Sequence, residues 1–261
     1  MRRWLVGVSV LGLALAMFAG PGGVAASGEG AGPVFGAQRV SRGDVNTYNW
    51  SGYAVYKDGV TFTHVAGDWT QPTIPAGVCA KQKTQLASFF VGIDGNNSNS
   101  VEQIGTDADC FKGQSVHYAW YEMYPAPPTN LACPLKGGDA VHADVQYNSG
   151  VLFTLTITIN GDPCFSGVLA APVTPARSSA EWIAEAPATG SHFWPLTNFG
   201  TVTFKNATAT GNGTTGAIDA PWTNDKISMV VRGRTFKDPI FKAQPGGLTG
   251  GNEFTINWLG S

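Results

Sequence analysis

Apolar and polar residues alternate with a period of two along most of this chain. The pattern is clearest at residues 141–147 and 151–159, where apolar side chains occupy every second position. The residues between them, 148–150, are Asn-Ser-Gly, which predicts a turn that joins two strands into a hairpin. Shorter apolar faces recur at 227–231 and 254–258, and no window after the N-terminal segment shows the 3.6-residue period of an amphipathic helix. The pattern predicts an all-β protein, either a sandwich or a barrel.

The first 26 residues differ from the rest and predict a secretory signal peptide. A basic start at residues 1–3 precedes an uncharged apolar run, and Val24-Ala25-Ala26 has the small residues of a cleavage site. The apolar run is shorter than the roughly 20 residues that a spanning helix needs, which disfavours an uncleaved membrane anchor. We therefore expect a secreted, extracellular protein without membrane attachment after cleavage. Residues 27–47 are predicted to be a flexible pro-segment or arm, and residues 48–261 a single domain.

The charge balance limits the classes of partner. Without the signal peptide the chain has 14 basic and 18 acidic residues, which argues against nucleic acid, because nucleic acid favours a basic surface. Only 13% of the residues are charged, against an average of about 25%. A protein with so few ion pairs loses little when its carboxylates become protonated, so this composition favours an acidic medium.

Four cysteines in an exported chain predict two disulfide bonds, because the compartment is oxidising. Three pairings are possible, and we favour the sequential one, Cys79 with Cys110 and Cys133 with Cys164. Each bond then closes a loop of about 30 residues, worth roughly 3–4 kcal/mol in the chain-entropy model. A metal site is the alternative, but neither Cys-x-x-Cys nor His-Glu-x-x-His spacing is present. We therefore expect no metal and no cofactor.

Residues 115–124 form the first segment with candidate chemistry. As a strand, the segment places Tyr118, Trp120, Glu122 and Tyr124 on one face. A glutamate among aromatic residues is unusual both for a core and for a solvated face. The segment is either an aromatic binding surface with Glu122 as a polar contact, or the edge of a core from which Glu122 reaches solvent.

Residues 179–185 form the second candidate segment. Glu181 and Glu185 lie on the same face of this predicted strand. Two carboxyl groups on one face can split their pKa values and serve as acid and base, or they can form an exposed polar face. Spacing alone leaves both interpretations open.

Several kinds of active site are excluded by the absence of their motifs. The chain has no Asp-Thr-Gly or Asp-Ser-Gly pair, no Gly-x-Ser-x-Gly turn and no glycine-rich phosphate loop. Its four histidines lack a serine or cysteine partner motif. The candidate chemistry is thus confined to carboxyl and amide side chains.

An ordered set of short motifs runs from residue 49 to residue 185. In chain order the motifs are Asn-Trp-Ser-Gly, Val-Gly-Ile-Asp-Gly, Gln-x-Gly-x-Asp, Ala-Trp-Tyr-Glu-x-Tyr-Pro and Ala-Glu-x-Ile-x-Glu. This ordered set resembles the glutamic peptidases, the eqolisin family of acid proteases. The resemblance implies a β-sandwich of two antiparallel sheets, similar to concanavalin A. It also implies a catalytic pair, Gln103 and Glu185, and residues that line or support a substrate cleft: Trp50, Phe90, Asp94, Trp120 and Glu122. Phe90 stands where the family has tryptophan, which changes the shape of a subsite.

The implied pair suits peptide hydrolysis. One carboxyl group can act first as a base toward water and then as an acid toward the leaving amine. The amide of Gln103 can donate a hydrogen bond where the carbonyl oxygen becomes negative, and it does not titrate in acid. We expect a monomeric acid endopeptidase that cleaves proteins or peptides.

Two alternatives use the same kind of sandwich. A glycoside hydrolase could use Glu122 as the acid and Glu185 as the nucleophile. A lectin-like module would bind carbohydrate on its aromatic strands without any chemistry. Neither alternative needs Gln103 in its motif.

Overall fold

The computed structural model describes residues 44–260 with gaps at residue 82, residue 97, residues 190–191 and residues 232–238. The predicted signal peptide and most of the predicted arm therefore lie outside the described residues. The described chain is built of strands and has one short 3-10 helix, η1 (Val78–Lys81). The strands are β1 (Asp44–Thr47), β2 (Trp50–Tyr56), β3 (Phe62–Thr70), β4 (Ser88–Asp94), β5 (Val101–Phe111), β6 (Gln114–Tyr124), β7 (Thr129–Leu131), β8 (Ala140–Ser149), β9 (Leu152–Ile159), β10 (Asp162–Ala170), β11 (Ser179–Glu185), β12 (Ala188–Thr189), β13 (His192–Phe193), β14 (Thr201–Gly211), β15 (Thr214–Gly216), β16 (Thr223–Val230), β17 (Phe241–Pro245) and β18 (Phe254–Trp258).

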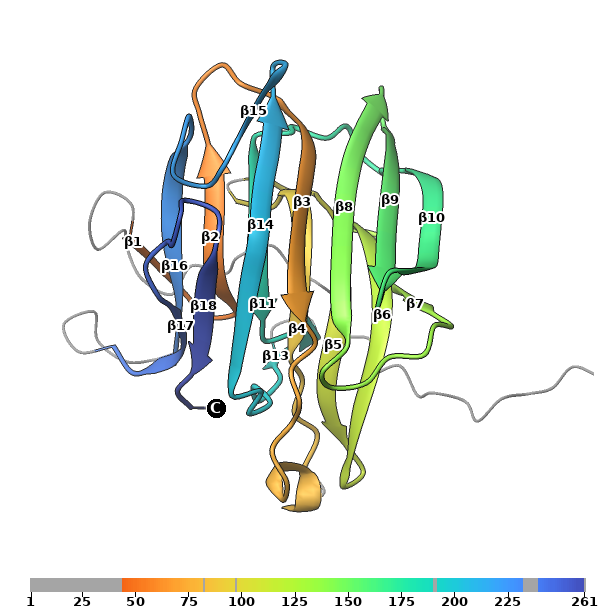
Figure 1. The fold of residues 1–261 in the computed structure, drawn as a ribbon, viewed down its shortest axis with the longest axis vertical. Coiled ribbons are helices and arrows are strands. Elements are labelled where there is room, and N and C mark those ends of the chain that lie inside the picture. The colour runs from red at the N-terminus through yellow and green to blue at the C-terminus, as the bar shows by residue number, and fades with distance from the viewer. Residues whose placement is uncertain (1–43, 82, 97, 190–191, 232–238, 261) are drawn as a thin grey trace, which may run out of the picture.

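The main sheet folds over on itself to form two layers (Figure 1). One layer has the order β10-β9-β8-β3-β14-β18, and the other has the order β2-β11-β4-β5-β6-β7. The sequence predicted an all-β sandwich of two antiparallel sheets, and the all-β class is confirmed, but both layers belong to one continuous sheet. The layers are continuous in hydrogen bonding, because β16 pairs with β2 on one side and with β17 on the other. Pairing is antiparallel throughout this path, and β1 joins β16 in parallel.

The predicted strands lie where the alternating pattern placed them. Strands β8 and β9 pair antiparallel as the expected hairpin, and every second residue of β9 is buried. The apolar faces near the C-terminal end became β16 and β18. The period of two therefore located both the strands and the side of each strand that faces the core.

The main hydrophobic core lies between the two layers. Two tryptophans cross it and satisfy their indole N–H groups on the opposite layer. Trp182 of β11 donates to the carbonyl oxygen of Ala66 in β3 at 2.8 Å, and Trp69 of β3 donates to the hydroxyl of Thr106 in β5 at 3.1 Å. Both indoles thus combine a large buried apolar area with a satisfied donor. These contacts fix one layer relative to the other.

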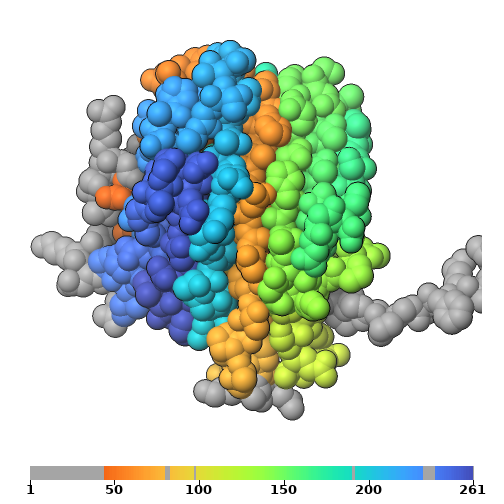
Figure 2. Space-filling model, viewed as in Figure 1, coloured from red at the N-terminus to blue at the C-terminus, as the bar shows by residue number. Residues whose placement is uncertain are grey.

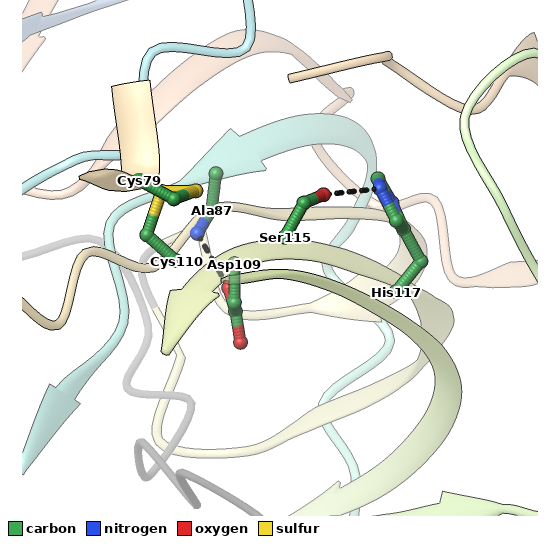
Figure 3. Close-up of a disulfide and its surroundings, with 6 residues drawn as sticks. All are labelled: Cys79, Ala87, Asp109, Cys110, Ser115 and His117. Carbon is green, nitrogen blue, oxygen red and sulfur yellow. Dashed lines mark hydrogen bonds between the residues drawn. A yellow bond between two sulfur atoms is a disulfide. The ribbon is translucent and has the colours of Figure 1, made fainter. Parts of the chain in front are cut away.

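Both predicted disulfide bonds are present in the sequential pairing. Cys79 of η1 is bonded to Cys110 near the end of β5, as Figure 3 shows, and Cys133 is bonded to Cys164 of β10. The first bond holds the 3-10 segment against the strand that carries Gln103. The second bond ties the chain after β7 to an edge strand of the other layer.

The outer face of the first layer is a continuous surface. In Figure 2 the side chains of β14, β3, β8 and β9 cover this face in adjacent columns. In the described part of the chain, no helix has the length and apolar character needed to cross a membrane. The second layer has a different outer face, on which the candidate residues lie.

Gly105 is required where β5 passes β4. A β-carbon at this position would lie 2.2 Å from the carbonyl oxygen of Phe89 and 2.6 Å from the β-carbon of Phe90. We expect Gly105→Ala to lower the free energy of unfolding by about 3 kcal/mol, because backbone must move to relieve the overlap. Urea unfolding followed by tryptophan fluorescence measures this change.

The matched control is Gly247→Ala. An added β-carbon there meets no atom within 4 Å, so the free energy of unfolding should change by less than about 1 kcal/mol. Equal losses in the two variants would contradict the steric explanation for Gly105.

Candidate active site

Strand register lines up four candidate positions across the outer face of the second layer. Glu181 of β11 is opposite Gly92 of β4, Gly92 is opposite Gln103 of β5, and Gln103 is opposite Glu122 of β6. Residues that are directly opposite in adjacent strands point to the same face of a sheet. Three polar side chains therefore share a row, and the glycine leaves space between two of them.

A second row crosses the same face four residues farther along the strands. Here Glu185 is opposite Trp50 of β2 and Ser88 of β4, and Ser88 is opposite Asp107 of β5. By the strand rise, the α-carbons of Glu181 and Glu185 lie about 13 Å apart. The two glutamates share a face, as predicted, but they belong to different rows and have different neighbours.

A small hydrophobic cluster, separate from the main core, fills the space around these rows. Its aromatic members meet edge to face: the ring centroids of Trp50 and Phe90 are 5.5 Å apart, and those of Phe90 and Trp120 are 5.9 Å apart. Trp50 and Phe90 are fully buried and Trp120 is 5% exposed, whereas Tyr118 and Tyr124 are partly buried at the margin. Trp50 and Phe90 are thus buried within the cluster on this face, and their contact with substrate stays a prediction.

Gln103 is held by Glu122. The Nε2 amide group donates to Oε2 of Glu122 at 2.5 Å, and Gln103 is 1% exposed. Its Oε1 atom is buried and accepts no hydrogen bond from any residue that the structure describes. A side-chain amide offers two donors and one acceptor. The contact with Glu122 fixes the amide in one orientation and leaves Oε1 for a further partner.

Glu185 is buried beside a second carboxyl group. Nδ2 of Asn49 donates to its Oε1 at 3.1 Å. Burial raises the pKa of Glu185 well above its usual range, and the charges of Glu122 and Asp107 raise it further. Glu122 thus bonds to Gln103 in the first row and acts electrostatically on Glu185 in the second.

Glu181 belongs to a different cluster of acids. Burial raises its pKa well above the usual range, and the charges of Asp94 and Glu102 contribute. A β-carbon added to Gly92 would lie 3.0 Å from Oε1 of Glu181 and 3.3 Å from Cβ of Gln103. The Glu181 carboxyl therefore lies over the glycine, next to the stem of Gln103. It is the alternative carboxyl that experiment has to distinguish from Glu185.

Asp94 supports the face through the backbone. Its carboxylate accepts the backbone N–H groups of Arg177 at 2.7 Å and Ser178 at 2.9 Å, just before β11 begins. Asp94 has a φ of 73°, and the next residue, Gly95, has a φ of 98°. A β-carbon on Gly95 would lie 2.7 Å from the ring of Trp50. The Asp94-Gly95 turn therefore anchors β11 and packs against the aromatic cluster.

Comparison with known proteins assigns this arrangement to a family. The model of the Peptidase A4 family matches residues 48–233. The chain belongs to this family. It is 32% identical over 195 residues to aspergillopepsin-2 from Aspergillus niger, a match that covers 66% of this chain and 68% of the relative. The chain is thus a glutamic endopeptidase, an acid-protease hydrolase, and this membership decides against the glycoside hydrolase and lectin alternatives.

Solved structures of glutamic peptidases share the fold. Scytalido-glutamic peptidase in complex with a peptide-based transition-state analogue superposes with a TM-score of 0.66 at 20% identity, covering 81% of this chain and 98% of that one. Aspergilloglutamic peptidase from Aspergillus niger superposes with a TM-score of 0.56 at 25% identity, covering 67% of this chain and 99% of that one. The two-layered β fold described here is therefore that of the family.

Four residues of the peptidase that lie in or beside the second row received no specific role from the sequence, although it placed Tyr118 on the correct face. They are a donor to Glu185 and three members of a hydrogen-bonded array: Asn49, Asp107, Asp109 and Tyr118. A signal existed for the two aspartates, because the period of two that starts at Gln103 continues through 105, 107 and 109. Acidic residues at alternate positions of a strand that is otherwise buried indicate a polar function on that face.

The peptidase shows no metal-binding arrangement among its described residues, since no group of three or more His, Cys, Asp or Glu side chains is placed to hold an ion. Two surface hollows lie away from Gln103 and Glu185. One, of about 550 Å³, is lined by residues around the Cys133–Cys164 bond. The other, of about 330 Å³, lies beside Trp69 and His142.

Proposed function

We propose that this peptidase hydrolyses peptide bonds with Glu185 and Gln103 as its catalytic pair. Glu185 takes a proton from water as the water attacks the carbonyl carbon, and then gives that proton to the leaving amine. Gln103 donates to the carbonyl oxygen as it becomes negative, and its Oε1 orients the water. No covalent enzyme intermediate forms.

One observation carries the proposal: Glu122 fixes the Gln103 amide and also acts on Glu185. A preorganised donor is effective because it needs no reorientation during the reaction. The 2.5 Å bond to Glu122 provides that preorganisation and leaves the second amide hydrogen for substrate. The buried Oε1 of Gln103, which accepts no hydrogen bond from the described residues, is the acceptor that a bound water would use.

The charge state of Glu185 sets the rate in acid. Because its pKa is raised, most molecules carry Glu185 protonated in strong acid, and the ionised fraction that acts as a base grows with pH. A carboxylate with a higher pKa is a stronger base once it is ionised.

We infer proteins and peptides as substrates. Relatives of the same fold were solved with a peptide-based transition-state analogue and with the tripeptide Ala-Ile-His. In this chain Tyr118 and Tyr124 lie partly buried at the margin of the carboxyl-rich face, beside the buried ring of Trp120. Aromatic rings at such a margin supply apolar contact for substrate side chains.

We propose that the mature enzyme works outside the cell as a monomer. The signal-peptide pattern of residues 1–26 and the two disulfide bonds support export into an oxidising medium. The low content of charged residues is compatible with an acidic medium.

Gln103→Ala tests the amide half of the pair. We expect kcat/KM to fall about 10²–10³-fold, the usual effect of losing one donor to the developing oxyanion, with little change in thermal stability. Cleavage of an unfolded protein substrate in mild acid measures the rate, and circular dichroism checks the fold.

The matched control is Gln114→Ala, at an exposed position of β6, which should keep full activity. A Gln103→Ala enzyme within threefold of the wild type would remove Gln103 from the mechanism.

A further inference from the structure

Two aspartates and one tyrosine form an array beside the proposed catalytic pair. Asp107 and Asp109 occupy alternate positions of β5 and are 5% and 2% exposed. Tyr118 is directly opposite Asp107 on β6. Its hydroxyl oxygen lies 2.7 Å from Oδ2 of Asp107 and 2.9 Å from Oδ2 of Asp109. Both distances are those of hydrogen bonds between oxygen atoms.

Counting protons shows what this geometry requires. A tyrosine hydroxyl carries one hydrogen, so it can donate to only one of the two carboxyl groups. The second short contact is a hydrogen bond only when that carboxyl group is protonated and donates to the tyrosine oxygen. The array is therefore complete with one carboxylate, one carboxylic acid and one tyrosine hydroxyl, and its total charge is −1.

The remaining carboxyl oxygens are also occupied. The indole N–H of Trp120 donates to Oδ1 of Asp107. The backbone N–H of Ala87 donates to Oδ1 of Asp109 at 3.1 Å, as Figure 3 shows, close to the Cys79–Cys110 bond. Donors from β6 and from the residue just before β4 thus hold each carboxyl group in place. The array has no freedom to separate its two acids without breaking these bonds.

We propose that Asp107 and Asp109 share one proton through Tyr118, and that Asp107 is a positioning residue that holds Trp120 and limits the negative charge next to Glu185. The proposal rests on the assignment of Glu185 as the catalytic base. Asp107 does not touch the reacting atoms. It acts through the indole of Trp120 and through its electrostatic effect on Glu185.

The surroundings support a shared proton. Burial raises the pKa of Asp107 to about 6, and burial together with the charge of Asp107 raises the pKa of Asp109 well above its usual range. Tyr118 faces the pair from β6, Glu185 faces Asp107 from β11, and β4 contributes the neutral hydroxyl of Ser88. The charges that act on the pair from these strands are therefore negative and favour retention of the proton.

Loss of the shared proton would disturb the site in two ways. Two adjacent carboxylates would compete for the single Tyr118 donor, and their repulsion would strain the bond to Trp120. The second negative charge would also make ionisation of Glu185 less favourable. Activity should therefore fall on the alkaline side of the optimum when the array loses its proton.

Asp109→Asn tests the shared proton, because the side-chain amide resembles the protonated carboxylic acid and does not lose a proton as pH rises. Its oxygen can accept from Ala87, and its NH₂ group can donate to Tyr118. We expect the variant to retain its activity at low pH. The alkaline limb of its kcat/KM profile should shift to higher pH by at least about one unit. That shift corresponds to about tenfold more activity at a pH one unit above the wild-type limb. An unchanged alkaline limb would overturn the proposal.

A spectroscopic measurement tests the proton without relying on activity. The infrared difference spectrum of the wild-type mature enzyme minus Asp109→Asn, taken at mildly acidic pH, should show one carboxylic acid C=O band that the variant lacks, while the bands of the other buried acids cancel. Tyr118→Phe should also shift that band and move the alkaline limb down, whereas Tyr121→Phe, on the opposite face of β6, should change neither. If Glu185→Gln stays active, the assignment of the base fails while the band still tests the shared proton. Absence of any band that depends on Asp109 would overturn the array itself.

Discussion

Replacing Glu185 by glutamine is expected to lower kcat/KM by about 10³-fold or more, because a general base typically contributes about 10²–10⁴-fold and the proposed mechanism also uses this group as the acid. The substitution keeps the shape of the side chain and an oxygen that can accept from Asn49. It also removes an acid whose burial is unfavourable when ionised, so the folded state should be retained. Steady-state kinetics on a peptide substrate, with circular dichroism as the fold check, measure the effect.

Glu181→Gln is the control that gives this result its meaning. Glu181 lies on the same strand and the same face as Glu185, and both residues are buried. Glu181 also lies in the row of Gln103. Its neighbours are Asp94 and Glu102, which have no proposed part in the reaction. We expect Glu181→Gln to keep kcat/KM within about threefold of the wild type. The opposite ranking of the two variants would transfer the role of base from Glu185 to Glu181.

The difference between these two glutamates marks the limit of what the sequence could predict. A period of two placed both on one face of one strand, and the structure agrees. Their neighbours depend on the register between β11 and its partners β2 and β4, which lie far away in the chain. Local residue patterns contain no information about that register, because a slip of two residues preserves the alternation of faces.

The same limit explains the array around Tyr118. The sequence placed Tyr118 on the face of Trp120 and Glu122, and that placement is correct. Recognising its function required the pairing of Asp107 with Tyr118 across β5 and β6, which sets the distance to both aspartates. The disulfide pairing was easier, since four cysteines allow only three arrangements and the sequential one is present.

Stability is expected to fall as pH rises from about 4 to about 8, the reverse of the usual dependence for carboxyl groups that form ion pairs. Burial raises the pKa of Glu102 to about 8 and that of Asp107 to about 6. Glu181 and Glu185 shift in the same direction. The folded state therefore holds more protons than the unfolded chain in this range, and the free energy of unfolding must decrease with pH.

The size of the effect is large in comparison with the stability of an ordinary domain. Each unit of pKa shift corresponds to about 1.4 kcal/mol, so Glu102 accounts for a loss of about 5 kcal/mol and Asp107 for about 3 kcal/mol when both have ionised. Typical domains have a total of about 5–15 kcal/mol. Burial lowers the pKa values of His64 and His117. These two groups therefore add stability as pH rises through about 6.5. They are outnumbered by the acids whose pKa values are raised.

Urea unfolding at a series of pH values, with both disulfide bonds intact, measures the dependence. The midpoint should be highest in acid and should decline continuously toward neutrality, with Glu102 contributing up to its folded pKa of about 8. Glu102→Gln should reduce the decline between about pH 4 and pH 8 by about 5 kcal/mol, because an amide has no proton to lose. Asp162→Asn, at an exposed position of β10, should leave the decline unchanged. A urea midpoint that stays constant or rises with pH would show that the buried acids are ionised in the folded enzyme. Burial would then also fail to explain why Asp107 and Asp109 keep a shared proton.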